Sequence, residues 1–212
     1  MSTDAKGRGR LITLEGGEGA GKSTQSKVVR DWLAAHGREV VLTREPGGSP
    51  LAEAIRGVVL GDWGEGVTPA TEVMLMFAAR AAHWHTTIAP ALAAGRDVVC
   101  DRFTDSSYAY QGAGKGVDEV ALRSLEGLAL GNHEPDLTLL LDIDPDVGLI
   151  RAQARGSDNR FEHETPEFMR RVRGGFLARA AAAPARFRVI DASGEVDAVS
   201  AEIIKALAAW SA

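Results

Sequence analysis

The stretch Gly16-Gly17-Glu18-Gly19-Ala20-Gly21-Lys22-Ser23 decides the fold, because it sets the pattern G-x-x-x-x-G-K-[ST] between two predicted elements. The apolar run Leu11–Leu14 before it predicts a strand, and Ser23–Ala35 after it predicts a helix that ends near Gly37. The glycines let several backbone N–H groups face one anion, and the helix adds its positive end. The context favours a phosphate-binding loop over a glycine-rich turn that matches by chance.

The loop residues have expected roles toward a nucleoside triphosphate. Lys22 is predicted to contact the β- and γ-phosphates, and the Ser23 hydroxyl is predicted to ligate Mg²⁺. The other predicted ATP-binding residues are Gly16, Gly17, Glu18, Gly19, Ala20, Gly21 and Thr24.

Composition fits one globular domain, since 45% of the 212 residues are hydrophobic and 25% are charged. The net charge of −5 argues against a protein that binds nucleic acid through a broad basic face. No segment reaches the roughly 18 apolar residues of a membrane span. The single cysteine, Cys100, excludes an intrachain disulfide and lies in an apolar run typical of a buried thiol. We therefore expect a cytoplasmic protein that binds neither nucleic acid nor membranes, with Met1–Arg10 as a flexible leader.

Further short runs of β-forming residues predict four more strands: Glu39–Thr43, Asp97–Cys100, Leu137–Ile143 and Phe187–Ile190. Helical segments separate them, including one long helix over Thr71–Ala94 that Pro90 could kink. Continuous apolar runs indicate strands covered on both faces, as in a parallel sheet with crossover helices. We predict an α/β fold with a single doubly wound five-stranded parallel sheet and flanking helices.

Residues that can carry chemistry follow the predicted strands, where ligands bind in such sheets. Asp101 directly follows the third predicted strand. An aspartate at the end of a strand beside a phosphate loop typically orients Mg²⁺. The alternative role for Asp101 is to cap the next helix. Arg102 follows, and its planar guanidinium is suited to binding a phosphate group. The alternative interpretation is that Arg102 is an ordinary surface arginine. Two other segments follow strands, Arg44–Gly48 and Asp142–Asp144.

The segment Arg151–Glu162 contains Arg151, Arg155 and Arg160, and Gly156–Asn159 between them breaks a helix into a flexible loop. Arginines on a mobile loop can close over a transferring phosphoryl group and neutralise its oxygens. The other interpretation is a solvated helix face. The phosphate loop earlier in the chain favours the first interpretation, in which these arginines close over a transferring phosphoryl group.

With these motifs in place, the chain resembles the thymidylate kinase family over nearly its whole length. The most specific match is the Asp-Arg-aromatic start and Ser-x-x-x-Tyr spacing within Val99–Gly112. The resemblance implies a P-loop NTPase fold in one domain, residues 11–212, with a lid at about 151–162. It implies transfer of the ATP γ-phosphoryl group to thymidine monophosphate (dTMP), giving dTDP in dTTP biosynthesis, with Mg²⁺ as cofactor and a homodimer. The other matching residues are Glu18, Thr43–Gly48, Arg80, Asp142 and Arg151–Glu162.

Roles follow from the resemblance by position. Asp101 would hold Mg²⁺ with Ser23, while Lys22 and Arg102 would be catalytic. Tyr110 would crowd the sugar 2′ position and Glu18 would approach the 3′-hydroxyl. The implied dTMP-binding residues are Glu18, Glu45, Pro46, Met76, Phe77, Arg80, Arg102, Ser107, Tyr110 and Gln111.

The chain departs from the family pattern in its phosphate loop, lid and base site. Some members carry an arginine in the phosphate loop, where this chain has Gly19, so we expect the lid to provide the catalytic arginine. Arg155 is the first candidate, followed by Arg151 and Arg160. The base-stacking phenylalanine of the family is Met76 here, with Phe77 one residue later, and the lid has Asn159 where the family commonly has aspartate.

Two other functions compete with this interpretation. A related P-loop kinase for another nucleoside or nucleotide would share the donor site. A non-enzymatic nucleotide-binding module would be expected to lack Asp101, Arg102 or the lid arginines, all of which are present. For the homodimer, Met74, Trp84 and Ile88 suggest a self-association face, with core packing as the competing explanation.

Overall fold

The computed structural model describes residues 7–131, 133–154 and 164–211. Five parallel strands form one sheet in the order β2-β3-β1-β4-β5. Each strand agrees with its predicted range to within one residue at either end, which confirms the predicted fold class. The strands are β1 (Leu11–Glu15), β2 (Val40–Arg44), β3 (Asp97–Asp101), β4 (Leu137–Asp142) and β5 (Phe187–Asp191).

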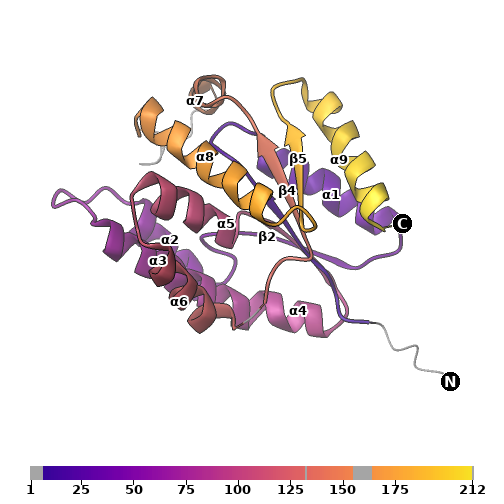
Figure 1. Cartoon of the computed structure of the whole chain (residues 1–212). Helices are drawn as coiled ribbons and strands as arrows, with labels where there is room; N and C mark the ends of the chain where they lie inside the picture. Colours follow the sequence, from indigo (N-terminus) through magenta and orange to yellow (C-terminus); the bar gives the residue numbers. More distant parts are fainter. Residues whose placement is uncertain (1–6, 132, 155–163, 212) are drawn as a thin grey trace.

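Helices cover both faces of the sheet (Figure 1). On one face, α1 (Lys22–Ala35) and α9 (Val196–Ser211) pack their apolar side chains on the strands. The opposite face is covered by α3 (Pro69–His83), α4 (Ala89–Ala93), α6 (Glu119–Leu130) and α8 (Pro166–Ala182). The central strands β1, β3 and β4 are buried almost throughout, as their continuous apolar runs predict.

The predicted long helix is a continuous helical run in which the π-helical segment η1 (Trp84–Ile88) joins α3 to α4. This segment lies directly before Pro90, whose ring and missing N–H disturb α-helical hydrogen bonding. Met74 is exposed on this run, whereas Trp84 and Ile88 are buried in the core. The suggestion that Trp84 and Ile88 form a self-association face is therefore wrong.

The remaining elements are α2 (Pro50–Leu60), α5 (Thr104–Ser107), the π-helical segment η2 (Tyr108–Gly114) and α7 (Pro145–Ala154). No helix within the described residues is long and apolar enough to span a membrane. Gly9 and Arg10, placed in the predicted leader, already belong to the folded domain, because the Gly9 N–H donates to Leu92 and the Arg10 guanidinium pairs with buried Asp97.

The carboxyl ends of the parallel strands meet at one edge of the sheet. Glu15, Asp101 and Asp142 are the last residues of β1, β3 and β4. Because α1 begins at the same edge, the loop that precedes it lies beside these acidic residues.

Candidate active site

The phosphate loop connects β1 to α1 and packs closely against its surroundings. Gly16, Gly19 and Gly21 all have positive φ angles, which favour glycine. A Cβ atom on Gly19 would lie 1.9 Å from the Gly148 carbonyl oxygen, so no side chain fits at that position. Gly21, the N-cap residue, offers no side chain to cap the helix, and the first turn of α1 is left to bind an anion.

Lys22 points back into this loop and is almost fully buried. Its Nζ donates to the carbonyl oxygens of Gly16 and Gly17, at 3.1 and 2.7 Å. Burial, together with the nearby Arg102 guanidinium, lowers the pKa of Lys22 to about 8. A phosphate group in the loop would offer this ammonium a better acceptor than the carbonyl oxygens do.

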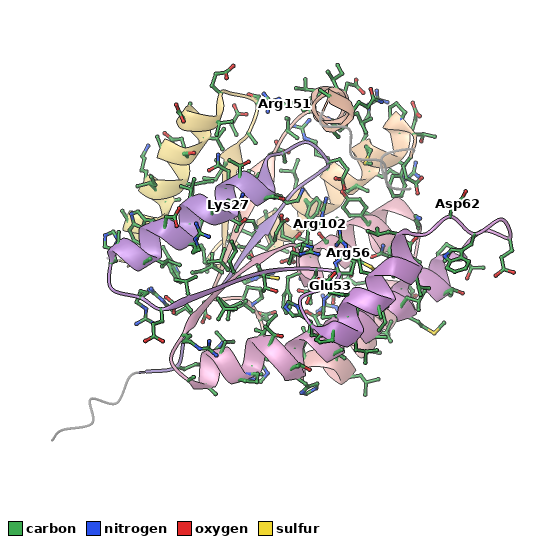
Figure 2. All side chains as sticks on the ribbon, turned by 180° about the vertical axis from the view of Figure 1, so that it is seen from behind. Lys27, Glu53, Arg56, Asp62, Arg102 and Arg151 are labelled. Carbon is green, nitrogen blue, oxygen red and sulfur yellow. The ribbon has the colours of Figure 1, made fainter. Side chains whose placement is uncertain are left out.

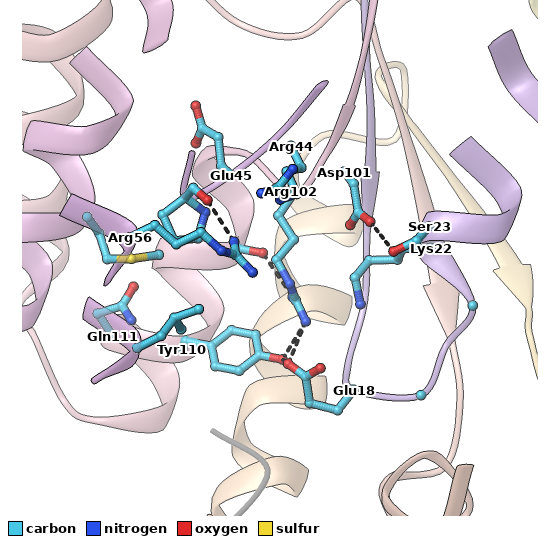
Figure 3. A pocket seen from close by; sticks show the side chains of 16 residues that line it. Glu18, Lys22, Ser23, Arg44, Glu45, Arg56, Asp101, Arg102, Tyr110 and Gln111 are labelled. Carbon is cyan, nitrogen blue, oxygen red and sulfur yellow. Dashed lines mark hydrogen bonds and ion pairs between the residues drawn. The ribbon is translucent and has the colours of Figure 1, made fainter. Parts of the chain in front are cut away.

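Ser23 and Asp101 meet as predicted for a metal site. The Ser23 hydroxyl donates to Asp101 Oδ2 at 2.7 Å, across the space between α1 and the end of β3 (Figure 3). The alternative role of Asp101 as a helix cap is not supported, because α5 begins after Phe103 without a side-chain cap. A hydroxyl and a carboxylate oxygen are the hard ligands that Mg²⁺ prefers, and two protein ligands leave room for phosphate oxygens and water.

Arg102 lies in the middle of the site and connects Glu18 in the phosphate loop to Tyr110. Its Nη2 donates to Glu18 Oε1 at 2.6 Å and to the Tyr110 hydroxyl at 3.1 Å. Tyr110 also donates to Glu18, at 2.9 Å, and burial raises the pKa of Tyr110, so its hydroxyl stays protonated. Arg102 and Tyr110 together hold the Glu18 carboxylate at the phosphate loop, where bound phosphates would otherwise repel it (Figure 3).

A cleft of about 200 Å³ lies between the phosphate loop and the segment that follows β2. The wall contains seven of the ten residues predicted to bind dTMP: Glu18, Glu45, Pro46, Met76, Arg102, Tyr110 and Gln111. The loop residues Gly19, Gly21, Lys22 and Ser23 line the same cleft, with Asp101. The structure thus brings the predicted donor and acceptor residues together at one site.

The three other predicted dTMP-binding residues do not line the cleft and are buried behind the residues that do. Arg80 is 1% exposed and donates to Glu45, Ser107 and the Phe103 carbonyl, at 2.7 to 3.0 Å. Ser107 is fully buried, and Phe77 packs in the core with the Arg80 guanidinium 4.7 Å from its ring centre. Of the two residues considered for the base contact, Met76 therefore lines the cleft and Phe77 does not.

Two cleft residues were not predicted from the sequence, Arg56 and Leu60, and two more, Arg44 and Ser106, lie in segments that the sequence singled out without giving them a role. Arg56 comes from α2 and donates to the Pro46 carbonyl at 2.7 Å. Figure 2 shows Arg56 and Arg102 near each other in the middle of the molecule. A basic residue on the helix after a Glu-Pro-Gly-Gly turn is a signal that could have pointed to Arg56, whereas nothing in the sequence marks Leu60.

Of the predicted lid arginines, Arg155 and Arg160 lie outside the described residues. Arg151 is on α7, and its guanidinium donates to the carbonyl oxygens of Ala192, Ser193 and Gly194. It lies at the top of Figure 2, apart from Arg102 and Arg56, and does not line the described cleft. In this structure Arg151 fastens α7 to the loop after β5.

The parallel sheet, the phosphate loop and the cleft beside it define a P-loop phosphotransferase. The family model described as thymidylate kinase matches residues 14–203. The chain belongs to the thymidylate kinase family.

Relatives and a solved structure are similar over nearly the whole chain. A thymidylate kinase of Chromohalobacter salexigens is 53% identical, with 96% of this chain and 99% of the relative covered. One of Pseudomonas fluorescens is 55% identical over 87% of this chain and 88% of its own. The crystal structure of thymidylate kinase from Ehrlichia chaffeensis has a TM-score of 0.78 and 34% identity, covering 94% of this chain and 99% of that one.

Proposed function

We infer that this protein transfers the γ-phosphoryl group of ATP to dTMP, forming dTDP and ADP in dTTP biosynthesis. Family membership supports this activity. In the structure, the strongest support is one set of contacts between the phosphate loop and the acceptor cleft. Glu18, part of the phosphate loop, is bonded to Arg102 and Tyr110, which line the acceptor cleft. The donor loop and the acceptor cleft are therefore one connected site, as direct transfer between two bound nucleotides requires.

On the donor side, the loop backbone and Lys22 bind the phosphates of ATP. Ser23 and Asp101 would hold Mg²⁺, which neutralises phosphate charge when bound. An oxygen of the dTMP phosphate attacks the γ-phosphorus while the bond to ADP breaks. Because that oxygen is already anionic, the step depends on positioning and charge stabilisation rather than on a strong base.

On the acceptor side, Arg102 supplies a guanidinium that can bind the dTMP phosphate with two parallel hydrogen bonds. The Tyr110 ring lies beside it, with its ring centre 5.0 Å from the Arg102 guanidinium carbon. We assign Met76 and Gln111 to the base, since both line the cleft and Figure 3 shows Gln111 on the side away from Lys22 and Ser23.

The experiment that tests this function is a coupled assay of ADP release with dTMP against uridine, cytidine and guanosine monophosphates. We expect kcat/KM for dTMP to exceed the others by at least about tenfold. Faster turnover of another monophosphate would identify a related kinase instead. ATP binding without ADP release from any of them would identify a non-enzymatic module.

Tyr110 is expected to control the choice of sugar. Replacing it with alanine should lower the ratio of kcat/KM for dTMP over its ribose counterpart by about tenfold, because the ring no longer crowds a 2′-hydroxyl. Tyr110→Phe is the matched control, since it removes the hydroxyl that binds Glu18 and Arg102 but keeps the ring. Steady-state kinetics with both nucleotides measure the ratio. An unchanged ratio in Tyr110→Ala would show that Tyr110 does not read the sugar.

We also propose that the protein is a homodimer through the outer faces of α2, α3 and α6. These helices pack against one another, and together they expose large apolar side chains. Large apolar side chains exposed on neighbouring helices are typical of interaction sites. The exposed residues are Leu51, Val58, Met74, Val120 and Leu128.

A double variant, Met74→Asp with Leu128→Asp, should convert the dimer to a monomer, because it sets charge within an apolar interface. Light scattering after size-exclusion chromatography should give twice the chain mass for the parent and once for the variant. Ile150→Asp is the control, as Ile150 on α7 is 68% exposed but lies outside this face. A double variant that keeps the parental mass would contradict the proposed face.

The family and the lack of a membrane-spanning helix within the described residues support a cytoplasmic location. We further propose that residues 11–212 form one kinase domain with a lid at about 151–162, as expected from the sequence.

A further inference from the structure

Glu15 is a fully buried carboxylate that none of the steps above uses. It is the last residue of β1, directly before the phosphate loop. Its Oε1 accepts from the backbone N–H groups of Phe103 and Ser106, at 2.8 and 3.3 Å. Its Oε2 accepts from the Ser106 hydroxyl at 2.6 Å. These three hydrogen bonds all go to the turn that follows β3.

That turn carries Arg102 in an unusual backbone conformation. Arg102 has a φ of 70°, the one positive value among the described residues other than glycine. Such a conformation persists only where neighbouring contacts hold it. The Arg102 N–H donates to Leu14 on one side, and the next N–H, of Phe103, donates to Glu15 on the other. Both contacts come from the end of β1.

Glu15 also reaches the Arg102 side chain through Ser106. The Ser106 hydroxyl donates to Glu15, and the same oxygen accepts from Arg102 Nη1 at 3.2 Å. A second bond from Nη1 goes to the Gly16 carbonyl at 3.0 Å. Glu15 therefore orients the hydroxyl that supports the guanidinium, in addition to fixing the backbone behind it.

Charged groups surround Glu15 on several sides. Burial raises its pKa to about 7, with a further contribution from Asp105, while the Ser106 hydroxyl and Arg102 act in the opposite direction. Lys22 and Arg186 also interact with its charge. The ionised form can accept all three hydrogen bonds at once, whereas a protonated oxygen would lose one of them.

We propose that Glu15 is a positioning residue for the acceptor nucleotide, which holds Arg102 in the geometry that binds the phosphate of dTMP. The proposal rests on the role of Arg102 under the proposed function. Glu15 is fully buried and does not line the described cleft, so it would act through the turn at residues 102–106.

Calorimetric titrations with dTMP and with ATP test this role. In Glu15→Ala, we expect the Kd for dTMP to rise at least about tenfold and the Kd for ATP to change less than about threefold. Glu15→Gln keeps the size and one acceptor oxygen, so it should cause a smaller rise in the dTMP Kd. Asp97→Ala is the matched control: Asp97 is an equally buried carboxylate at the opposite end of β3, bonded to Arg10 and Arg38. It should leave the dTMP Kd within about threefold of the parent.

A double-mutant cycle separates positioning from a general loss of stability. Once Arg102 is alanine, removing Glu15 should weaken dTMP binding by less than about threefold more. If Glu15→Ala does not fold, the same cycle is run with Glu15→Gln. Additive effects, or a dTMP Kd unchanged by either Glu15 substitution while Arg102→Ala weakens binding, would overturn the proposal. If Arg102→Ala itself binds dTMP as the parent does, the proposed function of Arg102 fails instead.

Discussion

Replacing Lys22 with alanine is expected to lower kcat by about 10³-fold or more while the protein stays folded. The ammonium is buried in the phosphate loop and donates to the backbone carbonyls of Gly16 and Gly17 in that loop. Its charge can follow the γ-phosphoryl group during transfer, and no other lysine lines the described cleft. The loop backbone remains in the variant, and with it the conformation that the glycines permit.

Lys27→Ala is the control for this substitution, because Lys27 is exposed on the same helix and lies outside the cleft (Figure 2). It should keep parental kcat. Single-turnover measurement of ADP formation, with circular dichroism to verify folding, distinguishes the two variants. A folded Lys22→Ala protein with kcat within tenfold of the parent would contradict the assignment.

Arg155→Ala is the second substitution for which we expect a large effect, about 10³-fold in kcat with little change in the KM for dTMP. Position 19 cannot provide a catalytic arginine, because the loop there touches the backbone of α7. The prediction rests on the sequence, since Arg155 lies outside the described residues. A contact that forms chiefly in the transition state lowers kcat rather than substrate binding.

The other two lid arginines provide the comparison. Arg151→Ala should have a smaller effect on kcat, because the Arg151 guanidinium is bonded to the carbonyl oxygens of residues 192–194. Arg160→Ala should also rank behind Arg155→Ala. Steady-state kinetics on all three variants decide the order. If each keeps near-parental kcat, the catalytic cation lies elsewhere and the lid mechanism is wrong, even though the kinase assignment stands.

The sequence predicted the sheet and the placement of the phosphate-loop residues well because their signals are local. Apolar runs locate strands, and the phosphate-loop pattern needs only eight consecutive residues. The pairing of Ser23 with Asp101 follows from the rule that strand ends meet at one edge of a parallel sheet.

The acceptor side was predicted less completely because it depends on distant residues. Met76 and Phe77 are neighbours in sequence, yet the rotation of roughly 100° between successive residues of an α-helix sets one on the cleft and the other in the core. The position of Arg80 depends on Glu45, which lies 35 residues earlier in the chain and pairs with the guanidinium behind the residues that line the cleft. The family pattern gave these residues but not their orientation.

The contact between Gly19 and Gly148 restricts how this enzyme can change over evolution. A Cβ on Gly148 would lie 2.4 Å from the Glu18 carbonyl oxygen, and one on Gly19 would meet the Gly148 carbonyl. The Gly148 backbone therefore excludes a side chain at position 19, the Glu18 carbonyl excludes one at position 148, and no single substitution at position 19 can introduce a loop arginine without moving α7. As long as relatives keep this backbone, they cannot move the catalytic arginine into the phosphate loop. Such a change requires the phosphate loop and α7 to shift together.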